Sequence, residues 1–233
     1  MPDHAGKIFL VATPIGNLED ITQRALRVLR ECDVVAAEDT RRTGRLLKHF
    51  EIEKPLLSCH QHNEARRADE LIARVLAGEN VALVSDAGTP GISDPGERFV
   101  RRAIAADLAV EPVPGACALV GALSASGLPT GEFHFVGFLP NKSGQRRKRL
   151  EALADVPGTW AFYESPYRVE KLLNELADLY PESEVVLARE LTKLHEEFIR
   201  GKAQELPDQL AGRKLKGELV VLVNASARSG EIR

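Results

Sequence analysis

The side chains with the clearest potential for chemistry lie in loops that follow short apolar runs. The longest such loop covers residues 86–96 and follows the run VALVS; its only charges are Asp86 and Asp94, and it contains no Lys or Arg. Its glycines let the backbone approach a ligand closely, and Asp86 could hold a hydroxyl group or a cation. Because open α/β sheets bind ligands in loops at the carboxyl ends of parallel strands, we expect a ligand-binding loop here. The alternative is a surface turn that is merely rich in glycine and proline.

A second loop carries groups suited to proton transfer and anion binding. Glu38 and Asp39 directly follow an apolar run, and Arg41 and Arg42 come next. A carboxylate can accept a proton, and a guanidinium group can bind phosphate through two hydrogen bonds. For each carboxylate the alternative is a helix cap or a surface ion pair. A basic run such as this one is also more often a solvated helix face than a binding site.

A third loop contains His60 and His62, which have a spacing that metal ligands can adopt. No neighbouring Cys and no HExxH motif joins them, so we interpret this pair as polar surface or as a hydrogen-bonding pair. We therefore expect no metal site.

Several common nucleotide and hydrolase motifs are absent. The sequence has no GxxxxGK[ST], no GxGxxG after the first apolar run and no GxSxG. These absences exclude a P-loop nucleotide hydrolase and disfavour a standard dinucleotide fold and a hydrolase elbow. None of the loops resembles a phosphate cradle, so a cofactor with an adenosine and a charged amino-acid end fits better than one with a pyrophosphate.

The elements that must position these loops alternate along the first half of the chain. Short apolar runs at residues 8–12, 33–37, 56–59, 81–85 and 108–113 alternate with helical segments, which predicts a parallel, doubly wound sheet. After the turn-rich stretch 126–131 the pattern restarts. We therefore expect an N-terminal α/β domain at residues 1–126, with the cofactor loop, and a C-terminal α/β domain with a mixed sheet at residues 127–233. A cleft between two such domains is a natural ligand site.

Composition and charge indicate in which cellular compartment the protein works and which kinds of partner it binds. The net charge of −3 gives no overall attraction to nucleic acid, and a hydrophobic fraction of 44% suffices for a packed core. No apolar run approaches the roughly 20 residues of a membrane span, and the N-terminus lacks an apolar signal region. Three cysteines stand far apart, which predicts buried thiols in a reducing compartment. We expect a cytoplasmic protein without a membrane partner.

Longer motifs give a specific resemblance. The motifs that carry this resemblance are, in order, LVATPIGNLEDIT, AAEDTR, HNE, VALVSDAGTPGISDPG, PVPGACALVGALSASGLPT, GFLP, FYESPYR, RELTK and GE. From about residue 8 to residue 223, the chain resembles the ribosomal RNA small subunit methyltransferase I family. The resemblance implies the two-domain tetrapyrrole methylase fold, a class III methyltransferase architecture. It also implies methyl transfer from S-adenosylmethionine to the ribose 2′-oxygen of cytidine 1402 in the 16S ribosomal RNA of the 30S subunit, by a homodimer without a metal.

The resemblance implies the cofactor-binding residues, and the chemistry of the strand-end loops and basic runs provides the catalytic and RNA-binding candidates. The residues expected to bind S-adenosylmethionine are Pro14, Asp86, Ala87, Gly88, Ile92, Ser93, Cys117, Ala118, Tyr163 and Ala188. A ribose hydroxyl is a poor nucleophile, so a base or polarising group should help; the candidates are Glu38, Asp39, His62 and Lys193, with Glu64 and Glu196 as further possibilities. Residues expected to contact RNA are Arg41, Arg42, Arg66, Arg146, Arg147 and Arg149.

Departures from the wider fold keep two other functions open. The first loop is ATPIGN where tetrapyrrole enzymes carry GxGxGD, and the chain ends in ARSGEIR where many relatives continue into a helical tail. The first alternative is a methyltransferase acting on a tetrapyrrole or another small molecule, which the missing GxGxGD and the expected basic helix containing Arg146–Arg149 disfavour. The second alternative is a ribosome-binding module that keeps the fold without catalysis.

Overall fold

The computed structural model describes residues 5–224. The chain divides into two compact units, Met1–Cys117 and Ala118–Arg233, which are described separately. Two expectations concern positions outside the described residues: the absence of a signal region at the start of the chain, and the ARSGEIR segment at its end. Within residues 5–224, no helix has the length and apolar character needed to cross a membrane.

The first unit contains one parallel sheet. Its strands are β1 (Ile8–Val11), β2 (Val34–Ala37), β3 (Leu56–Ser58), β4 (Val81–Val84) and β5 (Val110–Val113), in the order β3-β2-β4-β1-β5. All four pairings are parallel, as the strand–helix alternation predicts. Every residue of β2 and of β4 is buried, because these strands lie inside the sheet with both faces covered.

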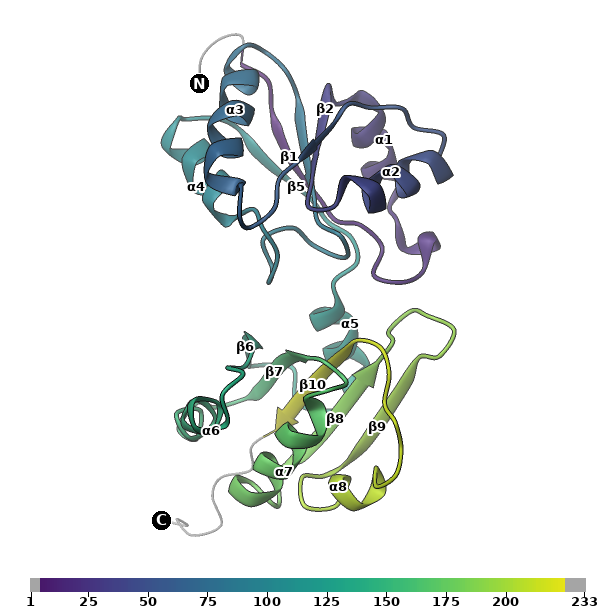
Figure 1. Ribbon diagram of the computed structural model, residues 1–233, viewed down its shortest axis with the longest axis vertical. Helices are drawn as coiled ribbons and strands as arrows, with labels where there is room; N and C mark the ends of the chain where they lie inside the picture. The colour runs from purple at the N-terminus through teal and green to yellow at the C-terminus, as the bar shows by residue number, and fades with distance from the viewer. Residues whose placement is uncertain (1–4, 225–233) are drawn as a thin grey trace. The chain divides into compact units, whose positions relative to one another are not determined.

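Helices cover both faces of this sheet, so the expected doubly wound arrangement is confirmed. The helices are α1 (Gln23–Glu31), α2 (Thr40–His49), α3 (Glu64–Leu76) and α4 (Glu97–Ala105), with a short 3-10 turn η1 at Leu18–Asp20. On one face Leu29 of α1 and Leu47 of α2 pack with Val35. On the other face Leu71 of α3 and Phe99 of α4 pack with Leu83 (Figure 1).

The second unit contains a mixed sheet, also as expected. Its strands are β6 (Phe133–Phe138), β7 (Thr159–Glu164), β8 (Glu184–Arg189), β9 (Glu197–Lys202) and β10 (Leu219–Asn224), in the order β6-β7-β10-β8-β9. Only β6 and β7 run parallel among these neighbours, and the other three pairings are antiparallel. The loops after β6 and β7 therefore leave the sheet at the same edge.

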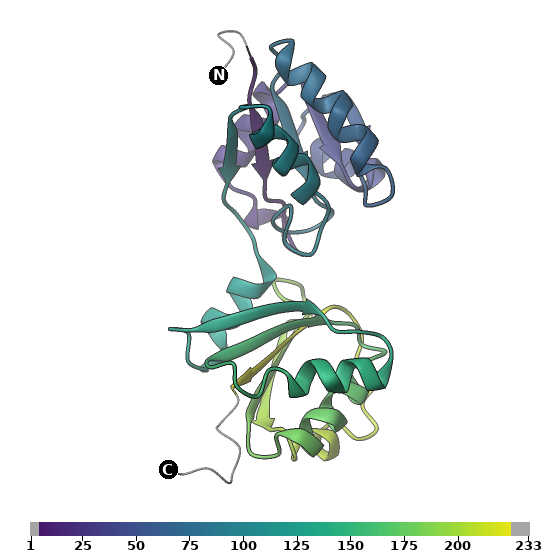
Figure 2. The ribbon, with the colours of Figure 1, turned by 90° about the vertical axis from the view of Figure 1, so that its left-hand side faces the viewer.

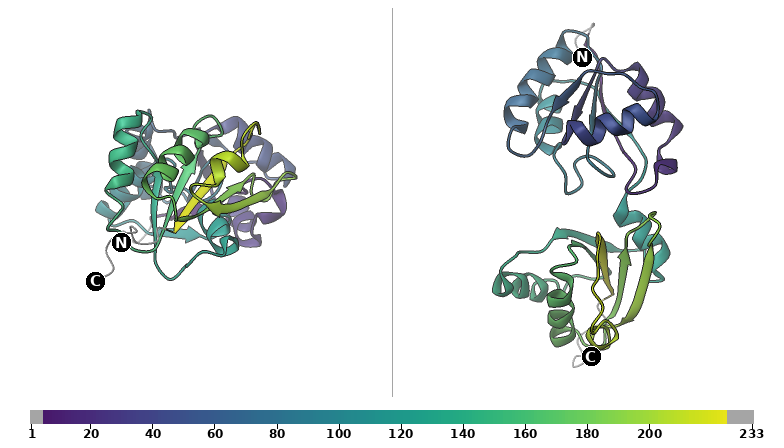
Figure 3. Two further views of the ribbon diagram at one scale, coloured as in Figure 1. Left: turned by 90° about the horizontal axis from the view of Figure 1, so that it is seen from below. Right: turned by 45° about the vertical axis from the view of Figure 1, so that its right-hand side comes forward.

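The helices of the second unit are divided unequally between the faces of its sheet. They are α5 (Ala118–Ser126), α6 (Ser143–Glu151), α7 (Val169–Leu179) and α8 (Leu206–Gln209). Leu150 of α6, Leu172 of α7 and Leu206 of α8 share one core with Trp160 and Val221 of the sheet. In Figures 2 and 3, α5 lies on the opposite side of this sheet from α6 and α7.

The unit boundary differs from the one expected between residues 126 and 127. Helix α5 contacts β10 and β8, and the guanidinium group of Arg200 donates to the carbonyl oxygens of Ala125 and Ser126, at 2.7 and 3.0 Å. These contacts attach α5 to the second sheet, and the division falls before Ala118. The turn at Gly127 marks the end of a helix and not the end of a unit.

Arg146 also differs from expectation, because its side chain is buried. It is 3% exposed and donates from Nε and Nη2 to the two carboxylate oxygens of Glu175, at 2.7 Å each. Burial alone would raise the pKa of Glu175, but hydrogen bonds from Arg146 and Ser143 outweigh it and lower that pKa. Arg146 therefore joins α6 to α7 and is not available to bind RNA; Arg147 and Arg149 of the same helix remain accessible.

Candidate functional site

Three loops are joined at the carboxyl edge of the first sheet. The N–H of Thr13, after β1, donates to the carbonyl oxygen of Gly88 at 2.9 Å, and the N–H of Gly88 donates back to Thr13 at 3.0 Å. The hydroxyl group of Thr13 also donates to the carbonyl oxygen of Ser85 at 3.2 Å. The loop after β5 joins through the hydroxyl group of Thr89, which donates to the carbonyl oxygen of Ala116 at 3.2 Å.

Gly88 sits where these three loops meet. Its φ angle is +88°, a conformation that glycine adopts without strain. A Cβ atom at this position would lie 3.3 Å from the Cγ2 atom of Ile15 and 3.6 Å from the carbonyl oxygen of Ala116. A larger side chain would therefore press on both neighbouring loops. Further along the same loop, Gly91, Ser93 and Gly96 also have positive φ angles.

Glu64 fixes the far end of this loop. One of its carboxylate oxygens accepts hydrogen bonds from the backbone N–H groups of Gly96, Arg98 and Phe99, at 3.1, 3.0 and 3.4 Å. The Glu64 side chain is 5% exposed, and it satisfies N–H groups that the start of α4 leaves without helical partners. The sequence pattern Asp-Pro predicts Asp94 as the cap of this helix; that prediction is wrong, because α4 begins at Glu97.

Glu38, Asp86 and Asp94 interact electrostatically at the same edge. Burial raises the pKa of Glu38, and the charge of Asp86 raises it further. Burial also raises the pKa of Asp94, to about 6, with the charge of Glu38 as the next contribution. The carboxylate of Asp86 accepts a hydrogen bond from the N–H of Asp39 at 2.9 Å and lies 3.4 Å from the guanidinium group of Arg42. The edge thus holds acidic groups with raised proton affinity.

Asp39 has a structural role that the sequence left as an alternative. It is the N-cap of α2, and its carboxylate accepts the backbone N–H of Arg41 at 2.8 Å. That hydrogen bond, followed by the side chain of Arg41, lowers the pKa of Asp39. Asp39 is therefore a weaker base than its neighbour Glu38.

The loop after β3 brings His60 near the acidic edge but leaves His62 exposed. The charge of His60 is one of the influences on Glu38, and its ring centroid lies 5.9 Å from that of His62. Asn63 shapes this loop by accepting the N–H of His60 and donating to the carbonyl oxygen of Ser58. Within residues 5–224, no group of three or more His, Cys, Asp or Glu residues is placed to hold a metal ion.

The remaining expected cofactor residues occupy varied environments. Pro14, Ala87, Cys117 and Ala118 are partly buried, whereas Ser93 is exposed and Ile92 is 40% exposed. In the second unit, the hydroxyl oxygen of Tyr163 accepts the N–H of Leu119 at 3.3 Å. Ala188 is 1% exposed and lies in β8 between β9 and β10, so its side chain is enclosed by the second unit.

Lys193 is a poor candidate for a base. Its ammonium group donates to Glu190 at 2.8 Å and to Glu218 at 3.0 Å. Burial alone would lower the pKa of Lys193, but these hydrogen bonds outweigh it and the pKa is raised. Lys193 therefore stays cationic at neutral pH and connects the RELTK and GE motifs. Glu190 packs against Gly217, where a Cβ atom would lie 2.2 Å from its carboxyl group.

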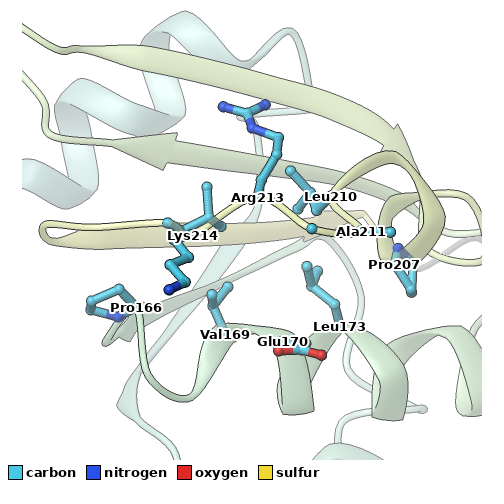
Figure 4. A pocket seen from close by; sticks show the side chains of 11 residues that line it. Pro166, Val169, Glu170, Leu173, Pro207, Leu210, Ala211, Arg213 and Lys214 are labelled. Atoms are coloured by element: carbon cyan, nitrogen blue, oxygen red, sulfur yellow. The ribbon is translucent and has the colours of Figure 1, made fainter.

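A cavity of about 260 Å³ lies elsewhere in the second unit (Figure 4). Val169, Leu173 and Leu210 contribute much of its apolar lining, and Arg213 and Lys214 come from the segment before β10. None of the residues expected to bind cofactor or RNA lines this cavity, although Pro166 of the FYESPYR motif does.

Curated relatives match almost the whole chain. Ribosomal RNA small subunit methyltransferase I from Pseudomonas aeruginosa is 53% identical over 94% of this chain and 79% of its own length. The protein of the same description from Halalkalibacterium halodurans is 47% identical over 98% of this chain and 79% of its own length. A family model, Tetrapyrrole (Corrin/Porphyrin) Methylases, matches residues 7–207.

The chain belongs to the ribosomal RNA small subunit methyltransferase I family of tetrapyrrole methylases.

Solved structures support the fold of this family. Uroporphyrin-III C-methyltransferase from Thermus thermophilus, complexed with S-adenosylhomocysteine, has a TM-score of 0.65 at 20% identity, over 94% of this chain and 97% of its own. The methyltransferase CobJ has a TM-score of 0.71 at 21% identity, over 96% of this chain and 95% of its own. At these identities the likeness concerns the fold alone.

Two residues of this edge have roles that the sequence alone does not suggest. Asp94 looks like a helix cap because a proline follows it. Only when the loop folds does its carboxylate come close enough to interact with the carboxylates of Glu38 and Asp86. Glu64 looks like a first-turn acid of its own helix, but it caps a helix that begins 33 positions later, at Glu97. Raised proton affinity next to two other acids is the physical signal that identifies Asp94.

The raised pKa of Asp94 predicts a pH-dependent stability change in Asp94→Asn. The folded-state pKa is about 6 against an ordinary value of 3.8, so between these values the folded chain keeps a proton that the unfolded chain has lost. Stability attributable to this group therefore falls as pH rises through that range. We expect Asp94→Asn to gain on the order of 1 kcal/mol relative to wild type near pH 8, and little near pH 4, in urea unfolding.

Glu53→Gln provides the matched control, because it makes the same chemical change at an exposed position of the first unit. Its difference from wild type should not grow over this pH range. An Asp94→Asn difference that stayed constant from acid to neutral pH would show that this carboxyl group has an ordinary proton affinity.

Proposed function

We propose that the chain transfers a methyl group from S-adenosylmethionine to the ribose 2′-oxygen of a cytidine in 16S ribosomal RNA. The supporting observation is 53% identity, over 94% of this chain, to a protein described as ribosomal RNA small subunit methyltransferase I. The proposal includes a homodimer that acts in the cytoplasm on the 30S subunit, and it takes cytidine 1402 as the target.

The loop containing Ala87 and Gly88 has properties that suit such a cofactor. Its residues are small, it carries no cationic side chain, and its glycine backbone would let main-chain groups approach a ligand. The neighbouring acids could accept hydrogen bonds from ribose hydroxyl groups or from an ammonium group. When bound, S-adenosylmethionine supplies a methyl group on a positively charged sulfur. The part of this chain is then to hold the cofactor and the 2′-oxygen in line.

Glu38 is our choice for the base that takes the proton of the 2′-hydroxyl group. Its carboxyl group follows β2 directly, and its pKa is raised by burial and by Asp86, which makes it a stronger base than Asp39. Asp39 is occupied as a helix cap and Lys193 is held as a cation. His62 is exposed and could assist at the edge of the site.

RNA phosphates would be bound by arginine side chains that remain accessible. In the first unit, Arg41 and Arg42 lie at the acidic edge and Arg66 lies on α3; in the second unit, Arg147 and Arg149 lie on α6. Arg42 pairs with Asp86 and Arg147 pairs with Glu151 and Asp178. These ion pairs are partly solvated, so exchanging an acid for a phosphate would cost little.

Methyl transfer to unmodified 30S particles tests the proposed function. With labelled S-adenosylmethionine, we expect one labelled cytidine per particle, and ribose methylation should protect the adjacent phosphodiester bond from alkaline hydrolysis. Label on a base, or label only on a tetrapyrrole such as uroporphyrinogen III, would contradict the proposal.

Glu38→Gln separates the base from the rest of the site. The amide oxygen keeps a hydrogen-bond acceptor but cannot accept a proton, so we expect the single-turnover rate to fall by about 100-fold or more, with cofactor affinity retained. Asp39→Asn is the matched control and should reduce the rate by less than about tenfold. Full single-turnover methylation by Glu38→Gln would exclude Glu38 as the base.

A further inference from the structure

Two aromatic rings are exposed at one edge of the second sheet. Phe138, at the end of β6, is 59% exposed, and Tyr167, in the loop after β7, is 91% exposed. Single exposed apolar side chains are common on proteins. These two differ because β6 and β7 are parallel neighbours, with Phe138 opposite Tyr163, so both rings leave the sheet at its shared carboxyl edge.

Arg168 fastens the two loops to each other. Its guanidinium group donates to the carbonyl oxygens of Leu139 and Pro140, at 2.6 and 3.3 Å, and to the side-chain oxygen of Asn141. The carboxylate of Glu164 lies 3.2 Å from the Nε atom of Arg168 and is 1% exposed. Because residues adjacent to both rings share these bonds, the backbone that presents Phe138 and Tyr167 is fixed in advance.

The ring of Phe138 is also supported from behind. Its centroid lies 5.8 Å from that of Tyr163, which in turn lies 4.9 Å from that of Phe135, and both contacts are edge-to-face. An edge contact supports one side of a ring and leaves other parts of it accessible. The Phe138 ring is therefore held in place while more than half of the residue faces solvent.

Cationic side chains accompany the rings. Lys142 follows the loop after β6, and Lys148 and Arg149 lie on α6; all three are exposed, and within residues 5–224 none of them forms a salt bridge. Glu170 is the exposed acid closest in sequence to Tyr167. Two exposed rings and an exposed cation, Lys142, that follows Phe138 closely in the chain match the chemistry of single-stranded nucleic acid, in which bases offer flat faces and phosphates offer charge.

We propose that Phe138 and Tyr167 stack on unpaired bases of the RNA substrate, with Lys142 at a phosphate. This proposal rests on the proposed function. A double-stranded segment does not fit, because its base faces are already covered by stacking, whereas unpaired nucleotides can place a base against a side-chain ring. A second copy of this chain fits this surface less well than RNA does. If two copies met through the same surface, the cationic side chains of one copy would face those of the other and repel them.

Binding of unmethylated 30S particles and of a short single-stranded oligoribonucleotide tests this surface. We expect Phe138→Ala and Tyr167→Ala each to weaken RNA binding by about tenfold, because each removes the ring on which one base would stack. Phe138→Trp and Tyr167→Phe keep a ring and should bind within about twofold of wild type. Lys142→Gln should reduce the slope of log affinity against log salt by about 0.7–0.9, which the ring variants should not do.

Controls separate this surface from the rest of the molecule. Ile104→Ala removes an apolar side chain that is 64% exposed on α4 and should leave binding unchanged. Cofactor affinity, measured by calorimetry, should be the same as wild type in Tyr167→Ala, Lys142→Gln and Ile104→Ala. The monomer–dimer equilibrium, measured by sedimentation, should also be unchanged.

Two results would overturn the stacking proposal. Wild-type affinity in both alanine variants would remove the rings from the RNA surface, and conversion to monomers would identify a second copy of the chain as the occupant. Wild-type protein that bound neither particles nor oligoribonucleotide would instead contradict the proposed function itself. If the wild type methylated RNA normally and the ring variants bound RNA like wild type, only the stacking proposal would fail and the proposed function would stand.

Discussion

The site depends on the pair of backbone hydrogen bonds between Thr13 and Gly88. This exchange at 2.9 and 3.0 Å joins the loop after β1 to the loop after β4, and Thr89 adds the loop after β5. Parallel strands bring their carboxyl ends to one edge but do not fix the loops that follow. The backbone pair supplies that fixation, and it requires glycine because φ at Gly88 is +88° and Ile15 is close.

Electrostatic strain at this edge is balanced by structural contacts around it. Glu38 and Asp94 are carboxyl groups that burial makes harder to ionise, and Asp86 increases the repulsion for both. The loop nevertheless keeps its shape because Glu64 anchors the start of α4 through three N–H groups. The edge therefore combines Glu38, a carboxyl group of raised proton affinity, with a glycine loop that hydrogen bonds fix at both ends.

Much of the fold can be predicted from local pattern, and the failures have physical causes. The parallel sheet of the first unit follows from the alternation of short apolar runs with helical segments. Arg146 looks like a surface cation because its neighbours are basic, and only the position of Glu175 on α7 shows that it is buried. Glu64 takes the capping role expected of Asp94 because capping depends on which carboxylate reaches the N–H groups, and local sequence does not encode that distance.

Calorimetric titration of S-adenosylmethionine into Gly88→Val tests the central claim, that this three-loop edge holds the cofactor. We predict a loss of affinity of about 100-fold or more in a protein with wild-type circular dichroism, because a branched side chain would enter the space between Ile15 and Ala116. Gly91→Ala is the matched control: φ is +82° there, but a Cβ atom would meet nothing within 4 Å, so binding should survive. A folded Gly88→Val protein that bound the cofactor like wild type would contradict the account.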